Sequence, residues 1–124
     1  MPETRVVFYR EDDGSVPTLD WMKGLPVKVR DKCLEKIERL GELGHELLPP
    51  ESDYLGNEIY ELRTRFGQVR YRMLYFFHGT VAAVISHGFL KKTQKTPPKQ
   101  IQEAMKRKRK FEQNPQRHTQ EIYL

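Results

Sequence analysis

Apolar and polar residues alternate most clearly in the middle of the chain, across residues 58–97. Successive side chains of a strand point to opposite faces, so such alternation predicts β-strands. We predict one strand at Ile59–Arg63 and a long central strand at Val69–Phe77, joined by a Gly-containing turn at Thr64–Gln68.

The central strand has two unlike faces. One parity is wholly apolar or aromatic, whereas the other begins with Arg70 and Arg72 and ends with two apolar residues. Arg72 is therefore expected at the rim of an apolar floor that the ends of the chain cover. A hairpin turn at His78–Thr80 follows, and the apolar run Val81–Ser86 is typical of a strand buried on both faces.

The first half of the chain predicts a strand and two helices. Thr4–Arg10 is rich in β-branched and aromatic residues and is expected to pair with the later sheet. Ser15–Gly24 predicts a short helix, with Thr18 as its N-cap and Trp21 as a packing anchor. Beyond Pro26, apolar residues recur at helical spacing and give a longer helix one buried stripe. That stripe consists of Val29, Cys33, Leu34, Ile37, Leu40 and Leu43.

Prolines mark the remaining connections. His45–Asn57 contains Pro49–Pro50 and is predicted to be an irregular connector. His87–Lys95 is expected to leave the sheet as a lysine-rich loop, and Thr96 is the expected N-cap of a final helix from Lys99 to about Glu112.

The length of 124 residues favours one domain, which we place at residues 1–113, with a frayed C-terminal tail at residues 114–124. No apolar run approaches the roughly 20 residues that span a bilayer, and the N-terminus has no signal-peptide pattern. The single Cys33 allows no internal disulfide. We therefore expect a cytoplasmic protein without a membrane partner.

Charge divides the chain into two unlike halves. Residues 1–61 hold 8 Lys/Arg and 14 Asp/Glu, a net −6, whereas residues 62–124 hold 14 and 3, a net +11. Either the acidic half balances the basic half within one fold, or the basic half binds phosphate. Between Leu62 and Gln102 there is no acidic residue, and the cations are Arg63, Arg65, Arg70, Arg72, Lys91, Lys92, Lys95 and Lys99.

The motifs exclude several kinds of site. The chain has no Gly-rich nucleotide loop and no G-x-S-x-G sequence, and its four histidines and one cysteine lack metal-site spacing. A two-metal nuclease needs clustered carboxylates, and the basic half has none before Glu103. We therefore predict neither a metal nor a cofactor.

The kind of chemistry that these exclusions leave open is phosphate chemistry that uses cations and an imidazole. Metal-free RNA cleavage needs a base for the 2′-hydroxyl, cations for the phosphoryl oxygens and an acid for the leaving oxygen. Arginine, lysine and histidine side chains near strand ends supply these types: Arg63, Arg65, Arg72, His87, Lys91, Lys92 and Lys95.

Three stretches together carry a family resemblance. They are Tyr60-Glu61-Leu62-Arg63, then Tyr71-Arg72, then His87-Gly88-Phe89-x-Lys91-Lys92-Thr93-x-Lys95-Thr96-Pro97. Over nearly the whole chain the pattern resembles RelE/HigB-like toxins of type II toxin–antitoxin systems, above all their phage-derived subgroup. The resemblance implies an α+β fold, with helices packed on a twisted antiparallel sheet and elements in the order β-α-α-β-β-β-α.

It also implies an endoribonuclease that cuts mRNA on the ribosome without metal. Its partners would be that mRNA and a cognate antitoxin, often a helix-turn-helix protein. Arg72 matches the family's phosphate-stabilising arginine, Arg63 matches the basic residue of the preceding strand, and Lys91 and Lys92 fall where the family places another cation. Some relatives carry lysines where this chain has Glu61. Tyr123 is a loose match to the tyrosine that relatives place near the C-terminus.

We therefore predict a catalytic set of Arg72, Arg63, His87, Lys91 and Lys92. The predicted RNA-binding set is Arg65, Arg70, Lys95, Lys99, Lys106, Arg107, Arg109 and Lys110.

Each assignment has a structural alternative. Arg63 and Arg72 are alternatively salt-bridge partners of Glu58 or Glu61, and His87 is alternatively a structural histidine. The lysine loop is alternatively solvated, and Lys106–Lys110 suits the C-terminal end of a helix dipole as well as RNA. The alternative function is a non-catalytic binding module on the same fold, either a topoisomerase poison or an RNA-binding protein.

Overall fold

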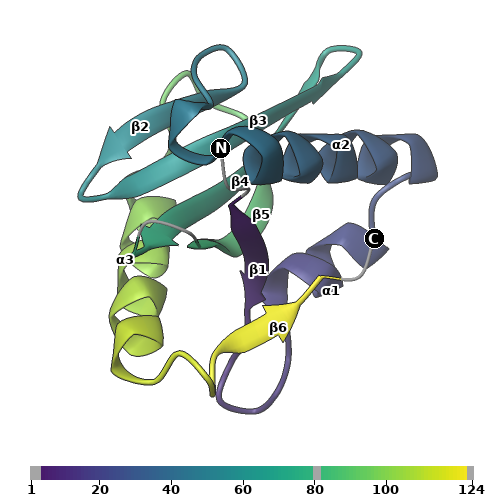
Figure 1. The fold of residues 1–124 in the computed structure, drawn as a ribbon. Helices are drawn as coiled ribbons and strands as arrows, with labels where there is room; N and C mark the ends of the chain where they lie inside the picture. Colours follow the sequence, from purple (N-terminus) through teal and green to yellow (C-terminus); the bar gives the residue numbers. More distant parts are fainter. Residues whose placement is uncertain (1–3, 80–81, 123–124) are drawn as a thin grey trace.

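The computed structural model describes residues 4–79 and 82–122, and in these residues three helices pack on one twisted six-stranded sheet (Figure 1). The predicted α+β class is confirmed. The strand order is β2-β3-β4-β5-β1-β6, and the β1–β5 pair is parallel whereas the other neighbours are antiparallel. The strands are β1 (Arg5–Tyr9), β2 (Ser52–Gly56), β3 (Ile59–Phe66), β4 (Val69–His78), β5 (Ala82–Lys91) and β6 (Thr119–Glu121). The helices are α1 (Pro17–Lys23), α2 (Val27–Leu43) and α3 (Pro98–Gln113), with a short 3₁₀ turn, η1 (Gly44–Glu46).

Two short strands lie where irregular chain was expected. β2 forms inside the predicted connector His45–Asn57, and β6 pairs with β1 inside the predicted frayed tail. Both are edge strands with polar residues. Their alternation signal is weak, and the neighbouring strand decides their conformation. The domain boundary at residue 113 stays a prediction.

β5 is also longer than predicted, and this matters for the site. Residues His87–Lys91 do not leave the sheet, because the ten-residue β4 provides a partner along their length, and Arg70 pairs with Lys91. β3 likewise continues to Phe66, so the turn before β4 is only two residues long. Both extensions keep the basic residues on regular strands.

The sheet buries side chains on both faces. One face packs against α1 and α2, and the predicted α2 stripe contributes the buried residues Val29, Cys33, Ile37 and Leu40. The other face, which includes Leu74 and Phe76, lies under α3 and confirms the expected cover from an end of the chain.

Side-chain packing corrects both predicted N-caps. Val16 and Pro97 occupy the N-cap positions of α1 and α3 without side-chain caps, and Thr18 is fully buried instead. Trp21 is a packing anchor as predicted, since a Cβ at Gly88 would collide with its ring. Thr80, Val81 and Tyr123, which carried predictions, lie outside the described residues. Among the described helices, none is both long and apolar enough to cross a membrane.

Candidate functional site

Three of the predicted cations meet at the buried carboxylate of Glu61. Alternation places Glu61 and Arg63 on the same face of β3, and the hairpin register sets Arg72 directly opposite Arg63. Lys91 lies on the adjacent strand β5, in the next row of the same face. The two-residue turn and the extension of β5 are what bring these positions together.

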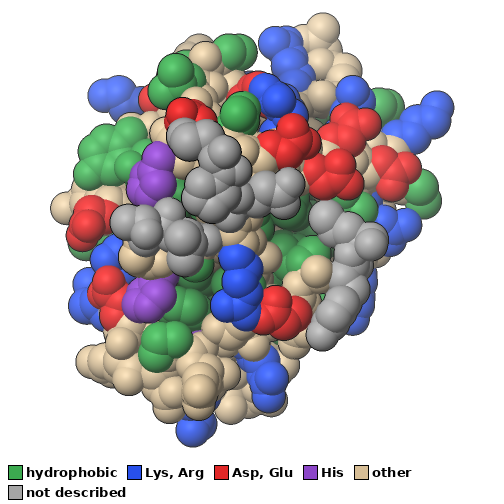
Figure 2. All heavy atoms as spheres, in the orientation of Figure 1, with side chains coloured by type: hydrophobic (Ala, Val, Ile, Leu, Met, Phe, Trp, Pro, Cys, Tyr) green, Lys and Arg blue, Asp and Glu red, His purple; other side chains and the backbone are tan. Residues whose placement is uncertain are grey.

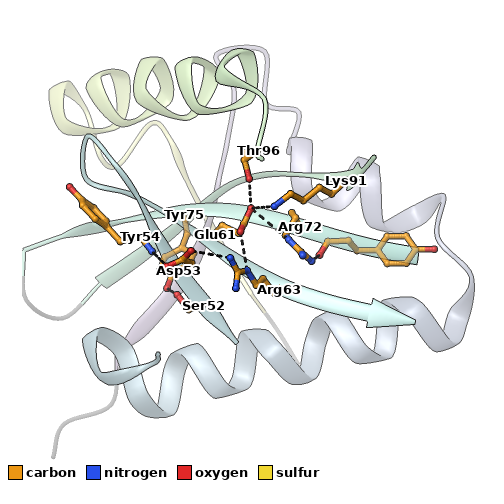
Figure 3. Close-up of polar contacts among 10 residues, drawn as sticks. Ser52, Asp53, Tyr54, Glu61, Arg63, Arg72, Tyr75, Lys91 and Thr96 are labelled. Atoms are coloured by element: carbon orange, nitrogen blue, oxygen red, sulfur yellow. Dashed lines mark hydrogen bonds and ion pairs between the residues drawn. The ribbon is translucent and has the colours of Figure 1, made fainter. Parts of the chain in front are cut away.

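The contacts at Glu61 come from four side chains (Figure 3). Arg63 Nε donates to Glu61 Oε2 at 3.0 Å, and Arg72 Nε and Lys91 Nζ each lie 3.6 Å from Oε1. Thr96 Oγ1 donates a hydrogen bond to Oε1, so the residue expected to cap α3 instead anchors the loop after β5. Arg63 Nη2 also donates to Asp53 Oδ2 at 3.0 Å. We call Glu61, Arg63, Arg72, Lys91 and Thr96 the Glu61 cluster.

Burial and charge act against each other in the Glu61 cluster. Burial alone would raise the pKa of Glu61. Hydrogen bonds from Thr96 and Arg63, together with the charges of Lys91 and Arg72, outweigh it and hold the pKa below its usual value. Burial lowers the pKa of Arg72 and of Lys91, and the attraction of Glu61 opposes both shifts. The carboxylate is therefore ionised and orients the N–H groups around it.

Two further cations, Arg65 and Arg70, lie beside the Glu61 cluster without acidic partners among the described residues. Arg65 and Arg70 face each other across β3 and β4, and Arg70 also faces Lys91 on β5. In residues 4–79 and 82–122, neither Arg65 nor Arg70 makes an ion pair. A pocket of about 460 Å³ opens next to them and is bordered by Arg63 and Arg72. Like charges directly opposite on a sheet are destabilising, which favours an anion at this end of the molecule.

Comparison with known protein families places the chain in one of them. Residues 20–109 match the family model described as "Phage derived protein Gp49-like (DUF891)". The chain belongs to this Gp49-like family. The family is of the RelE-like toxin type, and the match spans the whole Glu61 cluster. No curated protein matches the chain.

His87 of this Gp49-like protein stands apart from the Glu61 cluster. It occupies the same row of the sheet as Glu61, but Leu74 lies between them. Its Nδ1 contacts Ser86 Oγ at 2.8 Å and its Nε2 contacts Gln100 Oε1 at 2.8 Å. Burial lowers the pKa of the ring, so His87 is neutral at pH 7. Because both ring nitrogens have hydrogen-bond partners, the structure supports a structural role for His87 and not a catalytic one.

The cations of α3 do not join the cluster. Arg107 pairs with Glu11 and Glu103 and lies over the Tyr9 ring, while Lys110 pairs with Asp12. Lys106 and Arg109 are exposed, and so is Lys99 at the start of the helix. The predicted RNA-binding residues of α3 therefore surround the helix, whereas Arg65 and Arg70 lie at the cluster. Lys92 and Lys95 are exposed on the loop that Thr96 anchors.

Sequence reasoning missed Glu61 and Thr96 as members of the site. Glu61 was weighed only as a salt-bridge partner, and the structure supports that alternative for both Arg63 and Arg72. The parity of β3 was the available signal, because Glu61 shares a face with Arg63 and Arg65. For Thr96 no local signal existed, since its partner is 35 positions away. Within the described chain, no group of three or more His, Cys, Asp or Glu residues is arranged to hold a metal.

Proposed function

We propose that this Gp49-like protein is the toxin of a type II toxin–antitoxin pair and a metal-independent endoribonuclease that cuts mRNA on the ribosome. The observation that carries the proposal is the cross-strand pair Arg65 and Arg70, which lies beside the Glu61 cluster and forms no ion pair within the described residues. A fold keeps such a costly arrangement where it binds a polyanion. The RelE-like toxin type of the family points to RNA as that polyanion.

The cluster offers two of the three kinds of group that RNA cleavage needs, the cations and the acid. When the 2′-hydroxyl gives its proton to a solvent water molecule and the 2′-oxygen attacks phosphorus, the P–O5′ bond breaks and a 2′,3′-cyclic phosphate forms. Arg63 and Arg72 would hold the two non-bridging oxygens, where a planar guanidinium binds best. Lys91, whose pKa is lowered mainly by burial, would donate the proton to the leaving 5′-oxygen. Glu61 would keep the three cations aimed at the phosphate.

Induced expression in bacteria tests the proposal. The wild-type chain should arrest translation and cut mRNA within coding regions, which primer extension detects. Arg72→Ala should reduce the rate of mRNA cleavage about 10²-fold or more. This is the usual effect of losing one preorganised charge-stabilising donor. Arg72 is buried, so the variant's melting curve must show that it is folded.

Matched variants separate the site from general loss of charge. Arg70→Ala removes a less buried cation at the site and should also reduce cleavage. Arg117→Ala removes an exposed arginine that pairs with Asp12 outside the site, and its cleavage should equal that of the wild type. A folded Arg72→Ala protein that still cut mRNA at the wild-type rate would refute the assignment.

A specific observation favours a second candidate, a non-catalytic binding module. His87 is held by Ser86 and Gln100, so the described site presents no free imidazole near Glu61. The expressed protein would then leave mRNA intact. A DNA-damage response would identify a topoisomerase poison, and RNA binding without cleavage would identify an RNA-binding protein.

The family type also suggests an antitoxin partner, for which we propose a helix-turn-helix protein encoded beside this gene. Co-expression of that neighbour should restore growth and yield a stable complex on size-exclusion chromatography. Continued arrest in the presence of the neighbour would contradict this assignment.

A further inference from the structure

The pocket beside the Glu61 cluster is formed partly by α2, which lies outside the three sequence stretches that carry the family resemblance. Its volume is about 460 Å³, and it opens between α2 and the outer edge of β3. Six cations and two carboxylates line it, together with Pro50 and Thr64. The cations are Lys32, Lys36, Arg63, Arg65, Arg70 and Arg72, and the carboxylates are Glu35 and Glu51.

One wall of the pocket is an open strand edge. The pairing of β2 with β3 ends at Ser52 and Leu62, after which Arg63 N donates to Glu51 O at 2.8 Å. Backbone N–H groups of a strand alternate in direction, so the N–H of Arg65 points to the same side as that of Arg63. Within the described residues this N–H has no backbone acceptor. An amide donor therefore faces the pocket.

The charges in the pocket are unevenly satisfied. The Glu51 carboxylate forms ion pairs with Lys36 and Arg39, with N···O distances of 3.2 Å and 2.9 Å. Lys32 is exposed and, like Arg70, forms no ion pair in the part of the chain that the structure describes. Arg72 is only 7% exposed, and its Nη1 donates to Tyr71 O at 2.9 Å. Its Nε lies 3.6 Å from Glu61 Oε1, too far for a hydrogen bond, and has no hydrogen-bond partner in the described residues. A buried guanidinium with one unused N–H donor, an edge amide and an exposed lysine at one pocket are the donors that an oxyanion needs.

We infer that this pocket is a second phosphate subsite, which binds the RNA phosphate next to the one that is cleaved. The inference rests on the proposed function for its substrate. Arg63 and Arg72 belong to the Glu61 cluster and also line the pocket, so neighbouring phosphates of one strand would lie on the two sides of these residues. Lys32 and Lys36 then make α2 part of the RNA-binding surface, a role that the sequence pattern did not suggest.

Binding to a non-cleavable RNA tests the subsite without any need for catalysis. The probe is a fluorescent single-stranded oligonucleotide with 2′-O-methyl riboses, and the readout is anisotropy at several salt concentrations. Lys32→Gln should weaken binding several-fold and reduce the slope of log K against log salt by about 0.7, the value for one single-strand phosphate contact. Lys28→Gln changes an exposed lysine one turn earlier on α2, outside the pocket lining, and should bind like the wild type.

A second readout uses inorganic pyrophosphate and amide NMR. Titration should shift the Arg65 amide resonance in the wild type and shift it less in Lys32→Gln.

Equal RNA binding by Lys32→Gln and Lys28→Gln would overturn the subsite. An Arg65 amide resonance that does not shift would overturn it as well. Displacement of the RNA by a polyglutamate peptide, with the same dependence on Lys32 and at lower concentration than unlabelled RNA, would assign the pocket to an acidic protein segment instead. A wild-type protein that binds through Lys32 but never cuts mRNA would leave the subsite standing and defeat only the nuclease proposal.

Discussion

Glu61 provides the counter-charge for three cations at the basic end of the sheet. Its carboxylate is 1% exposed and lies within 4 Å of Arg63, Arg72 and Lys91. Without it, three cations would face one another on adjacent strands, two of them nearly as buried as Glu61 itself. The same carboxylate competes with any phosphate for those cations. One residue therefore both stabilises the site and limits its affinity for anions.

Glu61→Gln separates these two effects. The amide preserves the shape and still accepts from Thr96, but it leaves Arg72 and Lys91 buried without a counter-charge. We expect a loss of about 3 kcal/mol in the free energy of unfolding, typical for removal of one partner of a buried ion pair, measured by urea denaturation. Anisotropy with the non-cleavable oligonucleotide should show tighter binding by the folded variant.

The control for this prediction is Glu58→Gln. Glu58 is 77% exposed and pairs with Lys108, so its stability change should stay within about 0.5 kcal/mol. If Glu61→Gln were as stable as Glu58→Gln, the Glu61 cluster would not have the structural role that its contacts indicate.

At the scale of secondary structure, the sequence predicted the elements whose own pattern is strong. The stripe of α2 and the alternation of β4 give their conformation locally, because each buries a regular set of side chains. β2, β6 and the second half of β5 could not be predicted in this way. Their residues are polar or mixed, and they become strands because β3, β1 and β4 present unpaired backbone groups to them.

The same distinction applies to the site. The cationic character of β3 and β4 is visible in the sequence, and the hairpin register follows once the turn is known to be two residues long. Lys91 and Thr96 approach Glu61 only because β5 continues past His87, and that continuation depends on tertiary pairing. The contribution of α2 to the pocket needs the packing of a helix against a sheet edge, which no local pattern specifies.

Glu51 provides a prediction about the junction of α2 with β2. A hydrogen bond from Arg39 is the main cause that lowers the pKa of Glu51 to about 2 from its usual 4.5, and Lys36 contributes further. A carboxyl with a lowered pKa stabilises the fold above its unfolded pKa, and the stabilisation is lost as pH falls. The Glu51 contribution should therefore disappear between about pH 4.5 and pH 2.

Urea denaturation as a function of pH measures this effect. The stability difference between the wild type and Glu51→Gln should be present at pH 7 and shrink as pH falls through that window. Glu46→Gln alters an exposed carboxylate of the same region that makes no ion pair in the described residues, and its difference should stay small throughout. A Glu51→Gln difference that did not change with pH would show that the ion pair with Arg39 does not form in solution.

At the scale of the whole molecule, the fold separates its charges without cancelling them completely. Acidic side chains gather over α2 on the face shown in Figure 2. Several basic residues of the second half pair with acids of the first half, as Arg107 does with Glu11 and Lys110 with Asp12. Both interpretations of the charge asymmetry therefore hold in different places. Arg107, Lys108 and Lys110 of α3 pair with acids of the first half, whereas Arg65 and Arg70 at the end of the β3–β4 hairpin form no ion pair in the described residues.

This difference predicts unequal contributions to RNA binding. Replacing both Arg65 and Arg70 with Gln removes two pocket cations that form no ion pair with any described residue. It should reduce the slope of log K against log salt for the non-cleavable oligonucleotide by about 1.4, or about 0.7 for each lost contact. Replacing Lys106 and Arg109 with Gln removes the same net charge from the exposed side of α3. If binding occurs at the hairpin end, that second variant should keep nearly the wild-type slope and affinity, since the Debye length of about 10 Å at 0.1 M salt screens distant charges. Equal losses in the two double variants would mean that RNA responds to the overall charge of the molecule and not to a site at the end of the sheet.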